Sequence, residues 1–238
     1  MKYIVALSGG KDSTAMALRL AETEPRNYDY VFTPTGDEPE EMIDHWLKLG
    51  RLLGKPLHPL TTGKSLAGLI QIQKALPNWR MRWCTRMLKI EPFENYIVQN
   101  LPCTVYVGIR ADETDRDGVA YESMLGVQRD YPFQRWGWGL GDVLGYLKLR
   151  DAMPPERTDC ESCFFQTLYE WWKLWRYKRE KYLIYVGWED LTGHTLRSEQ
   201  RDSHPAALKE LAKEFEAGFV PKQRTMKDRP MMCSVCAR

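Results

Sequence analysis

Residues 3–13 of this 238-residue chain read YIVALSGGKDS, an apolar run that ends in two glycines, a lysine, an aspartate and two serines. Tyrosine, isoleucine and valine favour a β-strand, and the residues that follow, TAMALRL, have the spacing of a helix. A buried strand that turns directly into a helix is the first half of a β-α-β unit, which leads to a parallel sheet covered by helices. The opening residues therefore predict an α/β fold.

Two more apolar runs have the composition of buried parallel strands, residues 30–33 and 104–109. Segments with helical spacing lie between and after them, at residues 13–24, 39–53, 65–75, 85–99 and 141–149. This alternation predicts an open, mostly parallel, twisted sheet with helices on both faces, a Rossmann-like α/β domain. We expect that domain to occupy residues 1–155.

Pro154 and Pro155 mark a boundary, because the sequence pattern changes beyond them. A tryptophan-rich segment at residues 165–182 and a second segment at 205–217 have helical spacing, and the chain ends in MMCSVCAR. Residues 156–238 are therefore predicted to form a helical, cysteine-containing extension packed on the first domain. We expect the longer helix to pack its tryptophans on the sheet; the alternative is a nucleic-acid contact through its lysines and arginines.

The overall composition says more about the cellular compartment of the protein than about its function. Lys+Arg number 34 and Asp+Glu 32, a net charge of +2, and 43% of the residues are hydrophobic, enough for a sizeable core. No apolar stretch approaches the roughly 20 residues that span a bilayer, and the N-terminus lacks signal-peptide features, so we expect a cytoplasmic protein without a membrane partner. In a reducing compartment the six cysteines favour metal or redox chemistry over disulfides.

The segment SGGKDS has the properties of a phosphate site. The first turn of the following helix leaves N–H groups without partners, and the two glycines let an anion approach them closely. The lysine adds a full positive charge, and the serine hydroxyls can donate to phosphate oxygens. The plainer alternative is a glycine turn capped by its aspartate or last serine. The residues predicted to contact phosphate are Ser8, Gly9, Gly10, Lys11, Asp12 and Ser13.

Two more polar segments follow predicted strands, TGDEPEEM at residues 35–42 and VGIRADETDR at 107–116. Because ligands bind at the carboxyl ends of parallel strands, we expect both segments to meet residues 8–13 in one crevice. The residues predicted to line the crevice from these segments are Thr35, Asp37, Glu38, Gly108 and Arg110.

The charged residues of these segments have two interpretations each. Asp37 and Glu38 carry the hard oxygen ligands that Mg²⁺ prefers, or they cap the helix that begins near Pro39. Arg110 or Arg116 would bind phosphate or sulfate oxygens through its guanidinium fork, or would form a solvated surface pair with a neighbouring aspartate.

In this order the segments resemble the PP-loop adenine-nucleotide alpha-hydrolase superfamily. SGGKDS is similar to its PP-loop, while residues 35–42 and 107–116 resemble its phosphoadenosine phosphosulfate (PAPS) reductase and sulfate adenylyltransferase branch. The run YPFQRWGWGLGDVLGYL at 131–147 is similar to the segment before that branch's closing helix. Members bind ATP or a related nucleotide and act at its alpha phosphate. The resemblance thus implies ATP and Mg²⁺, and we assign catalysis to Lys11, Asp12 and Arg110.

Part of the cysteine pattern carries a second resemblance. RWCTRMLKIEPF at 82–93 resembles the Cys-Cys-x-x-x-Lys-x-x-Pro segment of assimilatory adenylylsulfate reductases, with Trp83 in place of the first cysteine. Cys160 and Cys163 fall where those proteins carry a second cysteine pair, and the four sulfurs of that family hold a 4Fe-4S cluster. The Arg-Trp-Cys-Thr segment is also shared with the sulfur-activating PP-loop proteins of DNA phosphorothioation systems.

The cysteine pattern has two interpretations as a metal site. Cys84, Cys160, Cys163 and one of Cys233 and Cys236 would hold a 4Fe-4S cluster beside the nucleotide, which leaves one thiol for sulfur transfer. Alternatively, the two Cys-x-x-Cys pairs would close a structural Zn²⁺ site that clamps the tail to the body. A third alternative is a set of thiols that binds no metal.

Reductases of this family commonly depart from a full SGGKDS loop and end in a Glu-Cys-Gly-type motif. Here the loop is intact and MMCSVCAR lacks the motif, so the sequence favours an ATP pyrophosphatase over a reductase. We therefore predict an enzyme that adenylylates an acceptor, releases pyrophosphate and takes part in sulfur transfer, with a sulfur donor protein and a nucleic-acid acceptor as candidate partners. One alternative is a PAPS or adenylyl-sulfate reductase or a sulfate adenylyltransferase. Another is a non-catalytic adaptor that binds nucleotide or nucleic acid.

Overall fold

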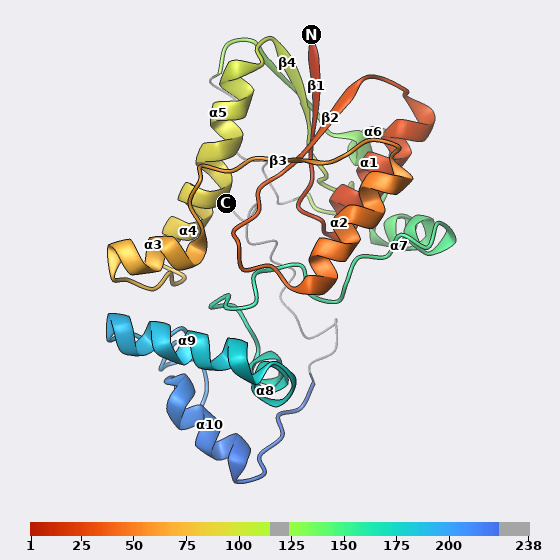
Figure 1. Cartoon of the computed structure of the whole chain (residues 1–238). Coiled ribbons are helices and arrows are strands. Elements are labelled where there is room, and N and C mark those ends of the chain that lie inside the picture. Colours follow the sequence, from red (N-terminus) through yellow and green to blue (C-terminus); the bar gives the residue numbers. More distant parts are fainter. Residues whose placement is uncertain (115–123, 224–238) are drawn as a thin grey trace.

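The computed structural model describes residues 1–114 and 124–223, and its centre is a five-stranded parallel sheet with the order β3-β2-β1-β4-β5 (Figure 1). The predicted strands are present as β1 (Lys2–Ala6), β2 (Tyr28–Phe32) and β4 (Cys103–Tyr106). The sequence pattern misses both edge strands, because β3 (His58–Pro59) has only two residues, both exposed, and β5 (Val127–Asp130) reads VQRD. The parallel pairing confirms the expected α/β fold.

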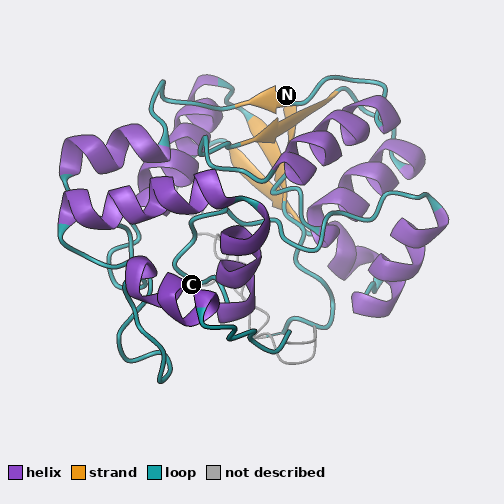
Figure 2. Cartoon of the chain, turned by 60° about the horizontal axis from the view of Figure 1, so that its bottom comes forward, coloured by secondary structure: helices purple, strands orange, loops and turns teal. Residues whose placement is uncertain are grey.

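Helices cover both faces of the sheet, as expected (Figures 1 and 2). One face packs against α1 (Lys11–Thr23), α2 (Glu40–Leu52), α6 (Pro132–Trp136) and α7 (Leu140–Leu149). On the other face Phe93 and Ile97 of α5 (Glu91–Gln99) join Ile4 and Val105 in a separate apolar cluster. The three central strands, β2, β1 and β4, are therefore covered on both sides, while the edge strands β3 and β5 stay more exposed.

The segment between β3 and β4 contains a π-helical turn. After α3 (Leu66–Gln73) and a loop, α4 (Trp83–Thr85) continues into η1 (Arg86–Ile90) and then into α5. At this turn the N–H of Glu91 donates to the carbonyl of Arg86, five residues back. The helix expected at residues 85–99 is thus present, but it begins two residues earlier and carries one inserted residue.

The C-terminal extension contains α8 (Leu168–Tyr177), α9 (Arg179–Thr192) and α10 (Leu208–Glu216). The single helix expected at residues 165–182 is wrong. Lys178 leaves the helical region with φ −132° and ψ 54°, and α9 then continues to Thr192, ten residues beyond the expected end.

The tryptophans of α8 pack on other helices and not on the sheet, which corrects the expectation. Trp171 is fully buried and meets the rings of Tyr182 and Tyr185 edge-on. The same apolar cluster includes Leu66 and Leu69 of α3, so the extension is anchored beside residues 66–90. Across the described part of the chain, no helix combines the length and the apolar character needed to cross a membrane.

Candidate functional site

The glycine loop, residues 8–13, joins β1 to α1 and requires glycine at its first turn. Gly9 has a φ of +77°, and a Cβ built there would lie 2.0 Å from Met42 Cε and 2.6 Å from Trp46 Nε1. Gly10 is the N-cap of α1 and supplies no side-chain cap. The first turn of α2 presses directly on the loop, so only glycine fits at residue 9.

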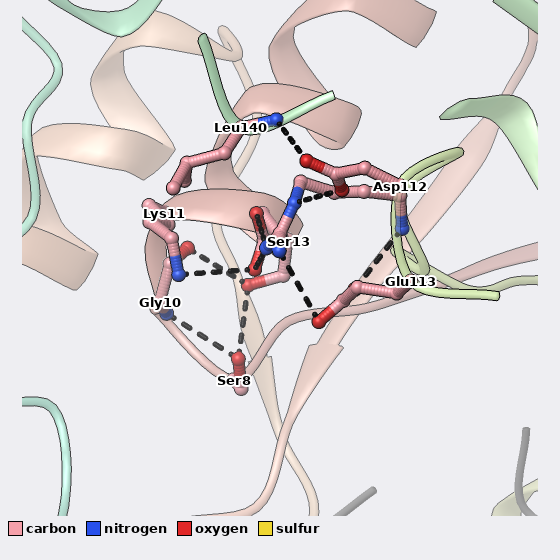
Figure 3. Close-up of polar contacts among 9 residues, drawn as sticks. Ser8, Gly10, Lys11, Ser13, Asp112, Glu113 and Leu140 are labelled. Atoms are coloured by element: carbon pink, nitrogen blue, oxygen red, sulfur yellow. Dashed lines mark hydrogen bonds and ion pairs between the residues drawn. The ribbon is translucent and has the colours of Figure 1, made fainter. Parts of the chain in front are cut away.

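The start of α1 presents free amides. Within the described residues no acceptor contacts the N–H groups of Lys11, Asp12 or Ser13, as expected for the first turn of a helix. Ser8 Oγ and Ser13 Oγ lie 3.1 Å apart, and Ser13 Oγ donates to the carbonyl of Gly10 at 3.2 Å (Figure 3). Amides, helix dipole and hydroxyls together have the character of an anion-binding site.

Lys11 and Arg110, both predicted to be catalytic, have different surroundings. The ammonium of Lys11 lies 3.3 Å from Asp12 Oδ2 and its side chain is 26% exposed, so it is free to turn toward a bound anion. The side chain of Arg110 is 1% exposed, with Nη1 3.1 Å from Asp12 and Nε 2.8 Å from Asp112. Its Nη2 lies 3.4 Å from Glu113, so three carboxylates surround one guanidinium. Figure 3 labels two of these carboxylates, Asp112 and Glu113.

This ion cluster fixes Asp12 behind the glycine loop. Burial opposes the charge of Arg110, but the carboxylates of Asp12 and Asp112 raise its pKa. Burial likewise opposes the charge of Asp112, yet hydrogen bonds from the N–H of Leu140 and from Arg110 lower its pKa. A direct contact between Arg110 and a phosphate stays a prediction, and the alternative residue, Arg116, lies outside the described residues.

One predicted neighbour, Gly108, and one residue without a predicted role, Thr158, reach the loop. A Cβ at Gly108, which follows β4, would lie 3.5 Å from the amide nitrogen of Ser13, so the backbone after β4 abuts the start of α1. Thr158 Oγ1 lies 4.0 Å from the position of a Cβ at Gly10. The linker toward the extension therefore passes beside the loop.

The segment after β2 is occupied by internal hydrogen bonds. Glu38 accepts bonds from the N–H and hydroxyl of Thr35, both at 2.6 Å, and from the N–H of Gly36 at 2.9 Å. Asp37 accepts bonds from the N–H of Ser162 at 2.9 Å and the hydroxyl of Tyr185 at 2.7 Å. Burial raises the pKa of Asp37, and these bonds oppose the rise. Coordination of Mg²⁺ by either carboxylate stays a prediction.

Three of the five predicted metal ligands line one small cavity. Cys84, Cys160 and Cys163 border it together with Lys89, and the hydroxyl of Thr35 lies 3.1 Å from Cys160 Sγ. Burial raises the pKa of Cys160 to about 12 and that of Cys163 to about 11, while the nearby Lys89 lowers both. Burial also raises the pKa of Cys84.

The metal itself stays a prediction. Within residues 1–114 and 124–223 no three His, Cys, Asp or Glu side chains are arranged to hold a metal ion. Cys233 and Cys236, the remaining predicted ligands, lie outside the described residues. The choice between an iron–sulfur cluster and Zn²⁺ therefore rests on the chemistry of the donors and on experiment.

The π-turn explains how Lys89 reaches this cavity. Lys89 stands five positions after Cys84, a spacing that in an α-helix would place the two side chains on different faces. The i-to-i+5 spacing of η1 brings them to the same side, and both line the cavity. Lys89 has no predicted role, although it belongs to the Lys-x-x-Pro part of the motif at residues 82–93.

Salt bridges from the extension fasten the cysteine segment. Glu161 is 4% exposed and pairs with Lys178 at 2.7 Å and with Lys181. Arg157 pairs with Glu170 of α8 at 2.9 Å and donates to the carbonyl of Cys160 at 3.0 Å. Sequence alone does not indicate these pairs, because charged residues on a helix are usually solvated.

Comparison with known proteins agrees with this geometry. The model of the family described as the phosphoadenosine phosphosulfate reductase domain matches residues 2–151. The chain belongs to this family. The PAPS reductase domain thus takes in the glycine loop, the segment after β2 and Cys84, while Cys160 and Cys163 lie just beyond it.

Relatives of this PAPS reductase family member include two uncharacterized proteins of Methanocaldococcus jannaschii. MJ0066 is 31% identical over 47% of the chain and MJ0973 is 27% identical over 65%. The aligned regions cover 23% and 38% of those proteins, so the chain spans well under half of either.

Two solved structures are similar to the chain. Phosphoadenylyl-sulfate reductase from Candida auris, in a phosphate complex, has a TM-score of 0.50 and 17% identity over 65% of this chain and 74% of the reductase. The U34-tRNA thiolase NcsA from Methanococcus maripaludis, solved with its 4Fe-4S cluster, has a TM-score of 0.49 and 17% identity, covering 100% of this chain and 80% of NcsA. The reductase shows the same fold.

Proposed function

We propose that this protein is a nucleotide-dependent sulfur-transfer enzyme of the PAPS reductase family. It binds ATP or a related adenine nucleotide at the glycine loop and acts at the alpha phosphate. The observation that carries the proposal is the 3.1 Å contact between Thr35 Oγ1 and Cys160 Sγ. Through it a half-buried thiol lies just beyond the end of β2, the strand next to the one that precedes the glycine loop.

The first step is adenylylation of an acceptor. An acceptor oxygen attacks the alpha phosphorus and forms a P–O bond, the bond to the bridging oxygen breaks, and pyrophosphate leaves with that electron pair. The amides of Lys11, Asp12 and Ser13 and the ammonium of Lys11 would stabilise the developing phosphate charge. Asp37 and Glu38 would bind Mg²⁺ only by exchanging their present hydrogen bonds for the metal.

The second step is displacement of AMP by sulfur. A hydrosulfide attacks the activated carbon of the acceptor, the C–S bond forms as the C–O bond breaks, and AMP leaves with the electron pair. Cys84, Cys160 and Cys163 are the soft ligands that iron–sulfur clusters take. A bound 4Fe-4S cluster would supply Lewis-acid iron to the sulfur donor. The ammonium of Lys89 lies among these thiols and would offset the negative charge of their thiolates.

Calorimetry with Mg²⁺ and ATP tests the nucleotide site. We expect Lys11→Ala to weaken ATP binding at least tenfold, because it removes the mobile charge of the glycine loop. Lys48→Ala is the matched control, since Lys48 pairs on the surface with Asp151 at 2.7 Å. Equal ATP affinity in wild type and Lys11→Ala would refute the site.

The reaction is tested by product analysis with ATP, sulfide and bulk nucleic acid. Release of pyrophosphate and AMP in equal amounts, with sulfur incorporated into the acceptor, supports the proposal. Thioredoxin-dependent release of sulfite from PAPS, with no pyrophosphate formed from ATP, would overturn it in favour of a reductase. ATP binding without turnover under all of these conditions would favour the non-catalytic adaptor.

Purification without oxygen, followed by metal analysis, tests the cysteines. A brown protein with about four irons supports a 4Fe-4S cluster. A colourless protein with one zinc supports the structural clamp. Loss of metal in Cys84→Ser supports the iron–sulfur cluster, because only the cluster set includes Cys84. Cys103→Ser is the control and should keep its metal under either alternative, because Cys103 lies buried in the sheet.

A further inference from the structure

The stretch between Asp44 and Glu91 has an unusual charge distribution. Residues 45–90 contain no aspartate or glutamate, although the whole chain has 32 of them against 34 lysines and arginines. The basic residues of this stretch are Lys48, Arg51, Lys55, Lys64, Lys74, Arg80, Arg82, Arg86 and Lys89. A block of like charge makes a positive surface unless other segments neutralise it.

Neutralisation is confined to part of the stretch. Lys48 and Lys55 pair with aspartates from outside it, and Arg86 pairs with Glu91 at 3.1 Å while 78% of its side chain stays exposed. In the described part of the chain, no carboxylate lies within ion-pair distance of Lys64, Lys74, Arg80 or Arg82. Three of these four cations, Lys74, Arg80 and Arg82, belong to the loop between α3 and α4, which therefore carries surplus positive charge.

That loop contains a hydrogen-bonded turn at residues 78–81, and the turn exposes the ring of Trp79 to solvent. Asn78 Oδ1 accepts bonds from the N–H groups of Arg80 and Met81, both at 2.9 Å, and the N–H of Asn78 donates to the carbonyl of Met81 at 3.2 Å. Trp79 is 59% exposed, and the guanidinium of Arg80 lies 4.7 Å from the centre of its ring. An exposed tryptophan on a turn that is closed by its own hydrogen bonds suits contact with a partner.

The turn borders the cysteine cavity. Pro77, just before it, and Cys84, just after it, both line that cavity. Phe165 also lines the cavity, and the guanidinium of Arg82 lies 6.0 Å from its ring centre. A ligand bound at the turn would therefore lie beside the cavity that Cys84, Cys160 and Cys163 line.

We propose that residues 78–82, together with Arg86, bind a single-stranded nucleic acid whose nucleotide at the cavity is the acceptor for sulfur. The arginines contact phosphates, and Trp79 stacks on a base. The role of that nucleotide as acceptor rests on the proposed function, whereas the binding surface stands on charge, exposure and position. The competing surface, α8 and the start of α9, is less positive, because Glu156 lies 3.9 Å from Lys173 of α8 and Glu216 pairs with Arg179 of α9 at 2.9 Å.

Fluorescence anisotropy on the full chain tests the surface, with labelled 20-nucleotide oligouridine and oligothymidine as probes at 50 to 200 mM KCl. We expect Trp79→Ala to weaken binding about 5- to 150-fold, the range for loss of one stacked base. We expect the double variant Arg80→Ala, Arg86→Ala to reduce the slope of log K against log salt by about 1.4, the value for two phosphate contacts on a single strand.

A second double variant, Arg176→Ala with Lys209→Ala, is the matched control, because it removes two exposed cations from α8 and α10. Tighter binding of oligouridine identifies RNA as the source of the acceptor, and tighter binding of oligothymidine identifies DNA; both support the proposal. Absence of binding to either probe at 50 mM salt, or an equal loss in the control, would overturn it. Unfolding curves that match wild type show that the variants are folded.

The outcome separates this proposal from the proposed function. Lys11→Ala should bind both probes with wild-type affinity, because the glycine loop lies outside the turn. If pyrophosphate release from ATP fails while the turn variants still weaken binding, the enzyme proposal falls and the surface stands. If ATP turnover succeeds and the turn variants bind normally, the surface falls.

Discussion

The glycine loop and the cysteine cavity are built from different kinds of contact. In the loop Ser8, Gly10 and Ser13 bond to one another within six residues of sequence, and Arg110 braces the loop from behind. The cavity instead takes residues from the segment after β2, from α4 and η1, and from the linker to the extension. Its fastening bonds join residues 125 and 148 positions apart, Thr35 to Cys160 and Asp37 to Tyr185.

This difference indicates what each site depends on. The geometry of the loop follows from the turn between one strand and one helix, so its shape is set locally. The cavity exists only when the extension has docked on α3 and the linker is in place. Changes in the loop should therefore remove ligand binding at small structural cost, whereas changes at the fastening bonds should loosen the cavity first.

Gly9→Ala should have the largest effect. The new Cβ would meet Met42 Cε at 2.0 Å in a backbone with φ +77°, so the loop must move away from α2. We expect ATP binding to fall below detection in calorimetry. Gly193→Ala is the control, because Gly193 has a similar φ of +68° but nothing within 4 Å of its Cβ position. If both variants bind ATP alike, close packing does not shape the loop.

Arg110→Met should give the largest loss of stability. It leaves three carboxylates without their shared partner, and breaking a buried ion cluster costs about 3–5 kcal/mol. Arg135→Met is the surface control, since Arg135 is 45% exposed and pairs with Glu24 and Asp130, and it should cost no more than about 1 kcal/mol. Urea unfolding measures both. Equal costs would contradict the bracing role of Arg110.

His45 should make the loop side of the molecule sensitive to acid. Burial lowers its pKa from 6.5 to about 4, helped by Lys48, and its Nε2 lies 3.1 Å from the hydroxyl of Thr14 in α1. The unfolded chain then gains a proton before the folded one, so stability is full above pH 6.5 and falls by about 3 kcal/mol as the pH drops to 4. Unfolding free energies should fall less steeply in His45→Gln. Parallel curves would argue against a buried neutral histidine.

Asp37→Asn should have the smallest effect on overall stability, and its effect on hydrogen exchange should be confined to one region. The amide replaces one acceptor oxygen, which leaves a bond from Ser162 or Tyr185 unmade at a cost of about 1–3 kcal/mol. Hydrogen exchange should quicken in residues 157–166 and α9 and stay unchanged in α1. Asp44→Asn, at an exposed position of α2, should change neither. Faster exchange in α1 would mean that the two sites are not separately maintained.

The same contrast explains what sequence predicts. Strands β1, β2 and β4 and the glycine loop follow from local apolar runs and turn residues, and the α/β fold follows from their order. The bonds of Asp37 do not, because its partners Ser162 and Tyr185 lie 125 and 148 residues away. Nor does the break at Lys178, because nothing in LWRYKREKY departs from helical composition. Family likeness indicated the cysteines, and the fold brings three of them together.

The π-turn makes the winding of this segment matter for the cysteine cavity. Lys89 stands five positions after Cys84, and with ordinary α-helical winding the two side chains would lie about 140° apart around the helix axis. Deleting Met87 or Leu88 would remove the inserted residue, restore α-helical winding and leave the lysine four positions after Cys84, on the same helix face. In this family member, the winding of the helix from Trp83 to Gln99 therefore decides whether the ammonium of Lys89 and the cysteine sulfurs line the same cavity.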